Sequence, residues 1–260
     1  METKLQNLIE GKKVAIVGPA EYVTKELNED HGNYIDNYDV VIRLNSFFYC
    51  PEKFKKYYGS RYDIISSSFW HRYNDDFTDK DFAWKSARYC IEEEYEKLNE
   101  KTILLECYAR NEFHEIYKRY KKVIDSKKLE YGNISVEKYY QVLNLLRSIY
   151  PLSKTPTTGF ATIGLVLSFK PRKLYITGVT AYQENPYKTH FDGYNIYPDE
   201  DKRGWDKAFN GKTFNVNGKE HPSAHHNCLG EAHIMKYLIE NKYVKVDKYM
   251  KKLFKNFNSN

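Results

Sequence analysis

A run of threonines followed by glycine is the first feature of the chain that could do chemistry. The segment Thr155-Pro-Thr-Thr-Gly159 stands directly before an apolar run over residues 160–169, which we expect to be a helix. The first backbone N–H groups of a helix have no internal acceptor, and the helix dipole adds positive charge there. We therefore expect Thr157, Thr158 and Gly159 to form a pocket for a carboxylate or a phosphate. A capped core helix is the alternative, because threonine is also a good N-cap.

The histidines gather in the second half of the chain, and two of them stand in contexts that suggest acid–base chemistry. His226 begins the segment His226-Asn-Cys-Leu-Gly-Glu231, in which an acid follows five positions later at a predicted helix start. An imidazole beside a carboxylate can take up a proton near neutral pH. We expect His226 to act as a general base, with Glu231 orienting its ring or supporting its charged form. His190, which precedes Phe191 and Asp192, is the second candidate.

The same residues do not predict a metal site. The chain has no H-E-x-x-H motif, and its four cysteines form no C-x-x-C pair. A metal held by His221, His225 and His226 is the weaker alternative. The D-x-D pattern at residues 199–201 lies in a charged stretch and is more simply explained as a solvated turn.

Short apolar runs separated by segments of helical spacing must position these side chains. The predicted strands are Lys13–Val17, Tyr38–Arg43, Tyr62–Ser66, Thr102–Glu106 and Lys173–Thr177, and the predicted helices between and after them include residues 112–125, 136–149 and 229–240. This alternation predicts an α/β fold with a single Rossmann-like, mostly parallel sheet and helices on both faces. Ligands of such sheets bind beyond the carboxyl ends of the strands, where Gly18, Asn45, Ser66 and Gly178 stand.

A chain of 260 residues is long enough for one sizeable domain, which we expect over residues 1–245. Within it, residues 180–224 are rich in glycine, asparagine, proline and aromatics without a clear period, and we expect them to form an active-site lid. Residues 246–260 form a basic tail with interleaved apolar residues. Such a tail either lies on a membrane surface as an amphipathic helix or packs on its own domain.

Composition and charge set the broad class of the protein. Hydrophobic residues make up 41% and charged residues 29%, as in soluble globular proteins, and residues 1–13 contain no long apolar stretch. We therefore expect a cytoplasmic protein without a signal peptide or a membrane span, with peripheral membrane contact through the tail left open. The net charge of +6 favours acidic partners, but it is spread along the chain rather than gathered into a nucleic-acid-binding arm.

Taken in order, these motifs resemble those of the sialyltransferases of glycosyltransferase family 29, and they are also similar to the bacterial sialyltransferases of family 42. Val14–Gly18 followed by Asp36–Asn45 looks like the large sialyl motif, and Pro156–Gly159 through Leu174–Gly178 looks like the small one. His190-Phe-Asp192 stands where the third motif would be, and His226 with Glu231 matches the final H-x4-E motif. These blocks cover about half of the chain, and Tyr182-Gln183 is similar to the bacterial family.

The resemblance implies a CMP-sugar transferase with a sialyltransferase-type variant of the Rossmann-like fold. Gly18, Pro19, Asn45 and Gly178 would lie on the nucleotide side of the donor site, although Pro19 stands where family 29 carries asparagine. Thr157, Thr158 and Gly159 would hold the phosphate and the sugar carboxylate. His190, with Tyr182 and Tyr187, would stabilise the leaving phosphate.

In the same scheme His226 would deprotonate a hydroxyl of the glycan acceptor in an inverting displacement that needs no metal and no further cofactor. A CMP-Kdo or other ulosonic acid donor is a close alternative to CMP-sialic acid. A non-catalytic nucleotide- or glycan-binding relative is a second alternative. A dinucleotide-dependent oxidoreductase is disfavoured, because residues 18–23 lack the G-x-G-x-x-G pattern.

Overall fold

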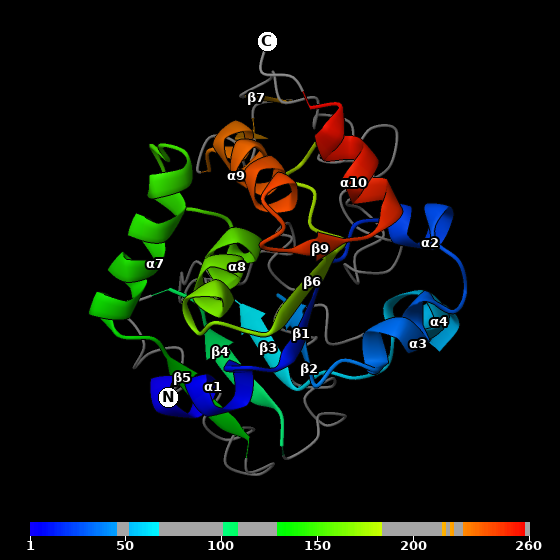
Figure 1. The fold of residues 1–260 in the computed structure, drawn as a ribbon, viewed down its shortest axis with the longest axis horizontal. Coiled ribbons are helices and arrows are strands. Elements are labelled where there is room, and N and C mark those ends of the chain that lie inside the picture. Colours follow the sequence, from blue (N-terminus) through cyan, green and yellow to red (C-terminus); the bar gives the residue numbers. More distant parts are fainter. Residues whose placement is uncertain are drawn as a thin grey trace, which may run out of the picture.

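The fold is built on one seven-stranded sheet in which every neighbouring pair of strands is parallel (Figure 1). The computed structural model describes residues 1–45, 52–67, 101–108, 129–183, 215–216, 219–220 and 226–257. The strand order is β5-β4-β3-β2-β1-β6-β9. The strands are β1 (Lys13–Val17), β2 (Val40–Leu44), β3 (Ile64–Ser67), β4 (Ile103–Glu106), β5 (Glu130–Asn133), β6 (Lys173–Thr177) and β9 (Lys245–Val246). The predicted α/β fold class is therefore confirmed.

All five predicted strands are present: β1 and β6 have the predicted bounds, and the bounds of β2, β3 and β4 differ by one or two residues. The strand predicted from Tyr38 begins at Val40, because the Tyr38 N–H still bonds to the carbonyl of Ile35 in the turn after a helix. Strands β5 and β9 were not predicted. They are the two edge strands. One is a polar Glu-Tyr-Gly-Asn segment and the other has only two residues, so neither carries the apolar run of a buried parallel strand.

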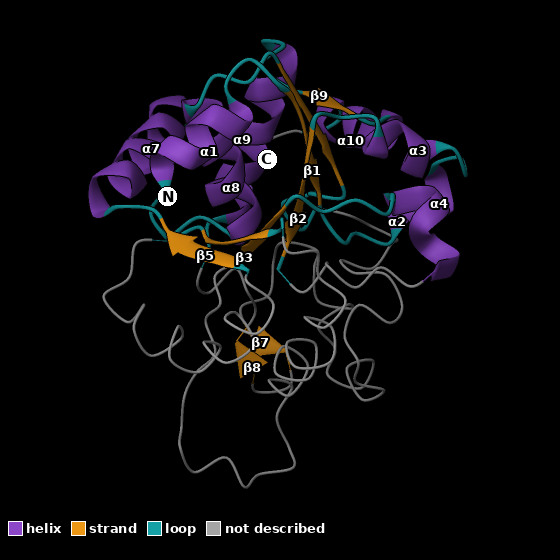
Figure 2. Cartoon of the chain, turned by 90° about the horizontal axis from the view of Figure 1, so that it is seen from below, coloured by secondary structure: helices purple, strands orange, loops and turns teal. Residues whose placement is uncertain are grey.

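Helices cover both faces of the sheet (Figure 2). One face carries α1 (Glu2–Ile9), α7 (Val136–Ile149), α8 (Thr158–Ser168) and α9 (Cys228–Glu240). The other face carries α2 (Tyr22–Glu26), α3 (His31–Asp36), α4 (Lys55–Tyr58), which follows the 3-10 turn η1 (Glu52–Phe54), and α10 (Lys248–Lys255). The predicted helix over 136–149 is confirmed, and the one predicted from residue 229 begins one residue earlier. The helix predicted over 112–125 lies outside the described residues.

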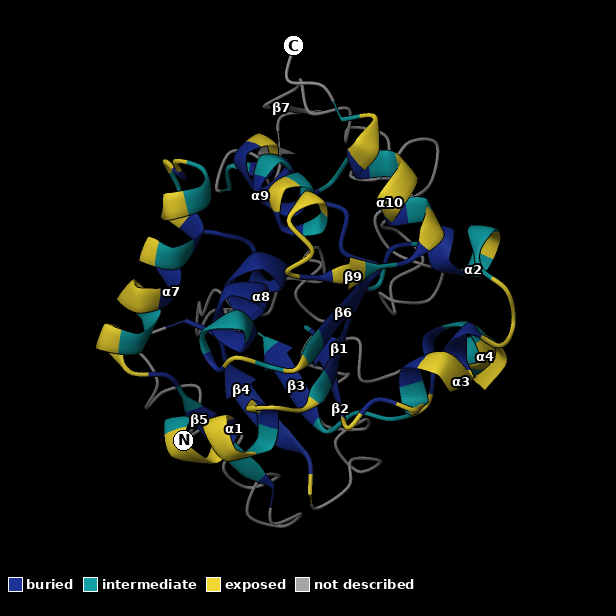
Figure 3. Ribbon diagram, in the orientation of Figure 1, coloured by how far each residue is buried: buried dark blue, intermediate teal, exposed yellow. Residues whose placement is uncertain are grey.

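The core runs through the sheet and into α8, as the dark ribbon in Figure 3 shows. Nine consecutive residues, Thr158 to Val166, are buried in α8. A helix that is apolar all round belongs in an interior, and α8 lies between the sheet and α7. Helix α7 is amphipathic by contrast, and it buries only Val142, Leu143 and Leu146. The sheet and α7 thus hold the start of α8 in a fixed position.

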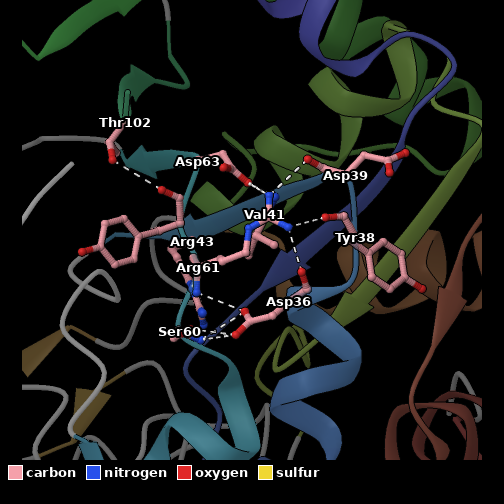
Figure 4. A network of polar contacts seen from close by, with 10 residues as sticks. Asp36, Tyr38, Asp39, Val41, Arg43, Ser60, Arg61, Asp63 and Thr102 are labelled. Atoms are coloured by element: carbon pink, nitrogen blue, oxygen red, sulfur yellow. Dashed lines mark hydrogen bonds and ion pairs between the residues drawn. The ribbon is translucent and has the colours of Figure 1, made fainter. Parts of the chain in front are cut away.

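A polar network fixes β2 against β3 on the side of Arg61 (Figure 4). The Arg61 guanidinium donates to the carbonyls of Asp36 and Tyr38, each at 2.7 Å, and to Asp63 Oδ2 at 3.0 Å. Arg43, on β2, is buried. It donates from Nε to the Arg61 carbonyl and from Nη1 to the Tyr58 carbonyl. These contacts give Arg43 a structural role.

The last described segment, residues 245–257, is packed on the domain. The predicted boundary between residues 245 and 246 falls inside β9, which pairs with β6. Asp247 then caps α10 by accepting the Met250 N–H at 2.9 Å, and Met250 and Phe254 are buried. The apolar residues of the predicted tail therefore face the protein interior. In the described part of the chain, no helix has both the length and the apolar content needed to cross a membrane.

The segment predicted to be an irregular lid, residues 180–224, is described only in part. Residues 180–183 form a turn, and Asn215–Val216 (β7) pairs antiparallel with Lys219–Glu220 (β8). The remainder of the predicted lid lies outside the described residues. Tyr187 and His190 fall there, so their predicted roles in holding the leaving phosphate stay predictions.

Candidate functional site

Two predicted donor-site glycines touch each other where β1 and β6 end. The Gly18 N–H donates to the carbonyl of Thr177 at 2.8 Å. A Cβ on Gly18 would lie 2.2 Å from the Gly178 carbonyl oxygen, and a Cβ on Gly178 would lie 2.1 Å from that of Gly18. Gly178 also has a φ of +71°. Close backbone packing therefore requires both glycines, whether or not a nucleotide approaches them. Pro19 follows directly and is half-buried.

Asn45 follows β2 at the same edge of the sheet. Its φ is +53°, a left-handed conformation that asparagine tolerates better than most other residues. Its N–H donates to the Ser66 carbonyl at 2.8 Å, and its Oδ1 accepts from the Ser67 hydroxyl at 3.4 Å. The asparagine thus has a local structural reason beside its predicted contact with the nucleotide.

The start of α8 is held by a carboxyl group from α9. Thr157 is the N-cap of α8, and its hydroxyl accepts from the Phe160 N–H at 3.4 Å. The same hydroxyl donates to Glu231 Oε2 at 2.9 Å, and the Thr157 N–H donates to Glu231 Oε1 at 2.5 Å. The side chain of Thr157 is therefore engaged inside the protein. The Thr158 side chain in turn hydrogen-bonds with Tyr108, so the predicted anion pocket is left with the backbone of Thr158 and Gly159.

Glu231 is fully buried, and its environment changes its charge. Burial raises the pKa of its carboxyl group to about 8, although the two hydrogen bonds from Thr157 lower that pKa. Near neutral pH the group mostly carries a proton. The sequence predicted that Glu231 orients the His226 ring or supports its charged form. In the fold both oxygens of Glu231 accept hydrogen bonds from Thr157, a contact that the H-x4-E spacing does not predict.

His226 lies against the segment that leads into α8. Its Nδ1 is 2.8 Å from the carbonyl oxygen of Thr155. A carbonyl oxygen only accepts hydrogen bonds, so Nδ1 carries the hydrogen of the neutral ring and Nε2 carries the lone pair. His226 is half-buried, and Asn227 next to it caps α9 by accepting the Gly230 N–H at 2.8 Å. The fold thus brings His226, Glu231 and the start of α8 together from segments more than 70 positions apart.

A buried acid ends β4 and a buried tyrosine follows it beside the start of α8, and neither was predicted as a site residue from the sequence. The Tyr108 hydroxyl donates to the carbonyl of Pro156 at 2.7 Å. Burial is the main cause that raises the Tyr108 pKa, which a hydrogen bond with the Thr158 side chain lowers. Glu106, the last residue of β4, is also buried. Their position at the carboxyl end of a predicted strand is the signal that could have identified them.

Tyr182 lies in a strained turn just after Gly178. Ala181 and Tyr182 have φ values of +52° and +58°, and the Gln183 N–H closes the turn on the Thr180 carbonyl at 3.1 Å. Two consecutive residues other than glycine or asparagine in this region store strain of about 1–2 kcal/mol each. Such strain often marks functional sites. The contact of Tyr182 with the donor stays a prediction.

A second buried network stands behind the glycine pair. The Tyr22 hydroxyl accepts the Gly178 N–H at 2.7 Å and donates to Asp247 Oδ2 at 2.7 Å. The same Asp247 oxygen accepts from the Thr177 hydroxyl at 2.7 Å. Burial first, and then the charge of Asp247, raise the pKa of Tyr22 well above its usual value. The network ties α2 and the start of α10 to the end of β6.

The described residues contain no cluster of three or more side chains that could hold a metal ion. No protein-family model matches the chain, and no curated protein matches it significantly. The fold defines an α/β protein with a parallel sheet. Any more specific assignment depends on the residues at the carboxyl edge of that sheet.

Proposed function

We propose that the protein transfers an acidic sugar, in the first instance sialic acid, from its CMP-activated form to a hydroxyl group of a glycan, with inversion and without a metal. The observation that carries the proposal is the hydrogen bond between His226 Nδ1 and the Thr155 carbonyl. It ties a candidate base to the segment that opens α8. A base and a helix N-terminus side by side are what an anionic donor and an alcohol acceptor need.

The tautomer of His226 supports its role as the base. Because Nδ1–H is donated to the Thr155 carbonyl, the lone pair of the neutral ring is on Nε2. The acceptor hydroxyl oxygen would form a bond to the anomeric carbon while its proton moves to Nε2. The bond between that carbon and the phosphate oxygen would break, and CMP would leave with the electron pair. A well-placed base contributes about 10²–10⁴-fold to the rate.

The first turn of α8 supports the anionic side of the reaction. The N–H groups of Thr158 and Gly159 belong to the first turn, which has no acceptors within the helix, and the helix dipole favours negative charge there. Glu231 does not cancel this effect, because a carboxyl group with a pKa of about 8 is mostly neutral at pH 7. A donor that carries a phosphate and a carboxylate would therefore meet little repulsion from it.

The proposal also covers the choice of donor sugar, the position of the nucleotide and the cellular compartment. A CMP-activated Kdo or another ulosonic acid presents the same carboxylate beside the anomeric carbon, so the pocket logic also admits these donors. Gly18, Asn45 and Gly178 supply a backbone edge where β1, β2 and β6 end, which is where nucleotides bind in parallel sheets. We place the reaction in the cytoplasm, as the sequence composition suggests.

The proposal is tested by measuring CMP release from CMP-sialic acid with a galactoside acceptor in the presence of EDTA. The unmodified protein is expected to release CMP only when the acceptor is added. His226→Ala should lower the rate by about 10²–10⁴-fold while CMP still raises the melting temperature. Full activity of this variant would show that His226 is not the base.

His226→Asn is the matched control. Its side-chain amide can still donate to the Thr155 carbonyl, but it cannot accept a proton at neutral pH. If His226 is the base, this variant should be as inactive as the alanine variant. Recovery of activity with asparagine would mean that the ring only holds the loop.

A thermal-shift series with CMP, CDP, UDP, GDP and NAD tests the donor class independently. Selective stabilisation by CMP is expected. Stabilisation by NAD alone would overturn the proposal in favour of a dinucleotide enzyme. Stabilisation by CMP without turnover on a broad panel of acceptors would assign the chain to binding rather than transfer.

A further inference from the structure

Helix α10 presents four lysines on one side. Lys248, Lys251, Lys252 and Lys255 are all exposed. At about 100° per residue they lie within an arc of about 100° on the helix. The buried residues Met250 and Phe254 lie on the opposite side. Within the described part of the chain, none of the four lysines forms a salt bridge.

The segment before α10 is also basic. It adds the exposed residues Lys242 and Lys245, the second of which lies on the edge strand β9. We call these two residues and the four lysines of α10 the lysine face. The exposed ribbon of α10 and β9 can be followed in Figure 3. The net charge of the lysine face is therefore strongly positive.

Within residues 240–257, acidic residues do not balance the lysine face. Residues 240–257 contain only two acids, Glu240 and Asp247. Glu240 pairs with Lys236 at 3.1 Å, and Asp247 is buried. Two exposed tyrosines accompany the lysines: the rings of Tyr237 and Tyr243 stack 6.2 Å apart and are 41% and 58% exposed.

We infer that the lysine face docks the protein on an anionic lipid surface. Clusters of four to eight basic residues on an amphipathic helix bind acidic headgroups through charge alone. Residues 226–257 contain no arginine. The face therefore offers strongly hydrated ammonium groups rather than planar guanidinium groups, which form bidentate hydrogen bonds with single phosphates or bases. That chemistry fits a diffuse array of headgroups better than a nucleic acid.

The docking is electrostatic and does not insert the helix. The sequence left two alternatives open for this tail, an amphipathic helix on a membrane surface or a segment packed on its own domain. In the fold the apolar side of α10 is occupied, because Met250 and Phe254 pack into the core. The aromatic rings of Tyr237 and Tyr243 are of the kind that lies at headgroup level. Contact through charge should therefore be reversible and sensitive to salt.

The test is co-sedimentation of the full chain with vesicles of phosphatidylcholine containing about 30% phosphatidylserine, compared with vesicles of phosphatidylcholine alone. Binding is expected only to the anionic vesicles, and it should be lost at about 0.5 M salt. Each lysine near such a surface changes binding about fivefold. Replacing the four lysines of α10 by glutamine should therefore weaken binding by roughly several hundredfold.

A control variant removes the same number of charges from other elements. It replaces four exposed lysines, Lys4, Lys25, Lys53 and Lys56, by glutamine. This variant should keep anionic-vesicle binding within about tenfold of the unmodified protein, because its lysines lie outside the lysine face. Far-ultraviolet circular dichroism and the melting temperature must match for both variants.

Three outcomes would overturn the inference. The first is equal binding of the unmodified protein to neutral and anionic vesicles, or to neither. The second is equal loss of binding in the two glutamine variants, which would mean that net charge and not the lysine face is responsible. The third is retention on a DNA duplex without binding to vesicles, which would assign the face to nucleic acid. None of these depends on transferase activity.

Discussion

The carboxyl group of Glu231 accepts both the backbone N–H and the hydroxyl of Thr157, a residue 74 positions earlier in the chain. One buried acid thereby ties the first turn of α9 to the N-cap of α8. The arrangement is strong because two donors converge on one group, and it is buried, so losing either partner leaves unsatisfied polar atoms. Glu231 is thus a positioning residue for the candidate anion pocket.

The charge of Glu231 should make stability depend on pH. Its folded-state pKa of about 8 lies above the ordinary value of 4.5, so the folded protein binds more protons than the unfolded chain between these limits. The free energy of unfolding should therefore be highest below about pH 4.5 as far as this group is concerned. It should fall by up to about 1.4 kcal/mol per pH unit as the pH rises toward 8.

Glu231→Gln isolates this contribution. The amide keeps an acceptor for the Thr157 N–H and a donor for its hydroxyl, but it does not titrate. Urea unfolding at several pH values should show that the free energy of unfolding of the variant increases relative to that of the unmodified protein as the pH rises to 8. If the free energy of unfolding changed with pH in the same way in both proteins, the assigned pKa of Glu231 would be wrong. Glu231→Ala should cost about 2–4 kcal/mol at low pH, because it leaves two buried donors unpaired, and this cost should shrink as the pH rises to 8, because the variant lacks the titrating group.

The same ionisation should affect donor binding if the proposed function is correct. Above pH 8 Glu231 becomes negative beside the first turn of α8 and should repel an anionic donor. We expect the KM for CMP-sialic acid to rise about tenfold between pH 7 and 9, which corresponds to about 1.4 kcal/mol of repulsion. Steady-state kinetics with Glu231→Gln should show a flatter profile. A rise of equal size in both proteins would point to another group.

The contact between Gly18 and Gly178 predicts that alanine at position 178 destabilises the protein more than alanine at Gly11, a glycine without close neighbours. Gly178→Ala adds a Cβ that would lie 2.1 Å from the Gly18 carbonyl oxygen, and it does so at positive φ. We expect a loss of at least about 3–5 kcal/mol in the free energy of unfolding. Gly11→Ala is the control, because Gly11 has a similar φ of +68° but no neighbour within 4 Å of the added atom.

In the Gly11 variant the free energy of unfolding should fall only by the strain of a left-handed alanine, which is about 1–2 kcal/mol. Urea midpoints of the two variants, with soluble yield as a second readout, separate strain from collision. Equal losses would show that the close approach of β1 and β6 does not require glycine.

The parts of the fold that sequence reasoning predicted are those where a local pattern is enough. A strand such as β1 is buried on both faces and so reads as an unbroken apolar run, whereas the edge strand β5 has a Glu-Tyr-Gly-Asn sequence that resembles a loop. The candidate site followed the same rule. Spacing selected His226 and Glu231 as candidates, but the direction of the Glu231 carboxyl group depends on a segment that only the tertiary fold brings near.

The local conformation of Asn45 and the buried contacts of Asp247 could not be predicted from the sequence. Asn45 was selected as a nucleotide contact because it ends a predicted strand, and its positive φ gives the asparagine a second reason to be there. Asp247 was placed in a tail, yet it is buried and accepts hydrogen bonds from two other elements. Neither feature has a signature of residue spacing, because both arise from how the strand ends meet.

The network of Tyr22, Asp247 and Gly178 leads to the last prediction. In Tyr22→Phe the ring remains, but the buried Gly178 N–H loses its acceptor and Asp247 loses a donor. The variant should lose about 2–4 kcal/mol in the free energy of unfolding, since one partner is a carboxylate. Tyr58→Phe is the control, because the buried Tyr58 hydroxyl donates to the Ala20 carbonyl and not to an acid. It should lose about 1 kcal/mol.

Amide hydrogen exchange distinguishes a local effect from a global one. With its acceptor gone, the Gly178 amide in Tyr22→Phe should exchange faster than global destabilisation alone predicts, because the end of β6 opens without unfolding the sheet. In Tyr58→Phe the exchange rate of the Gly178 amide should change only as much as the change in overall stability predicts. If Gly178 follows global stability in both variants, then Tyr22 does not hold the turn that follows β6. The position of the glycine pair beside the candidate site would in that case be set by the strands alone.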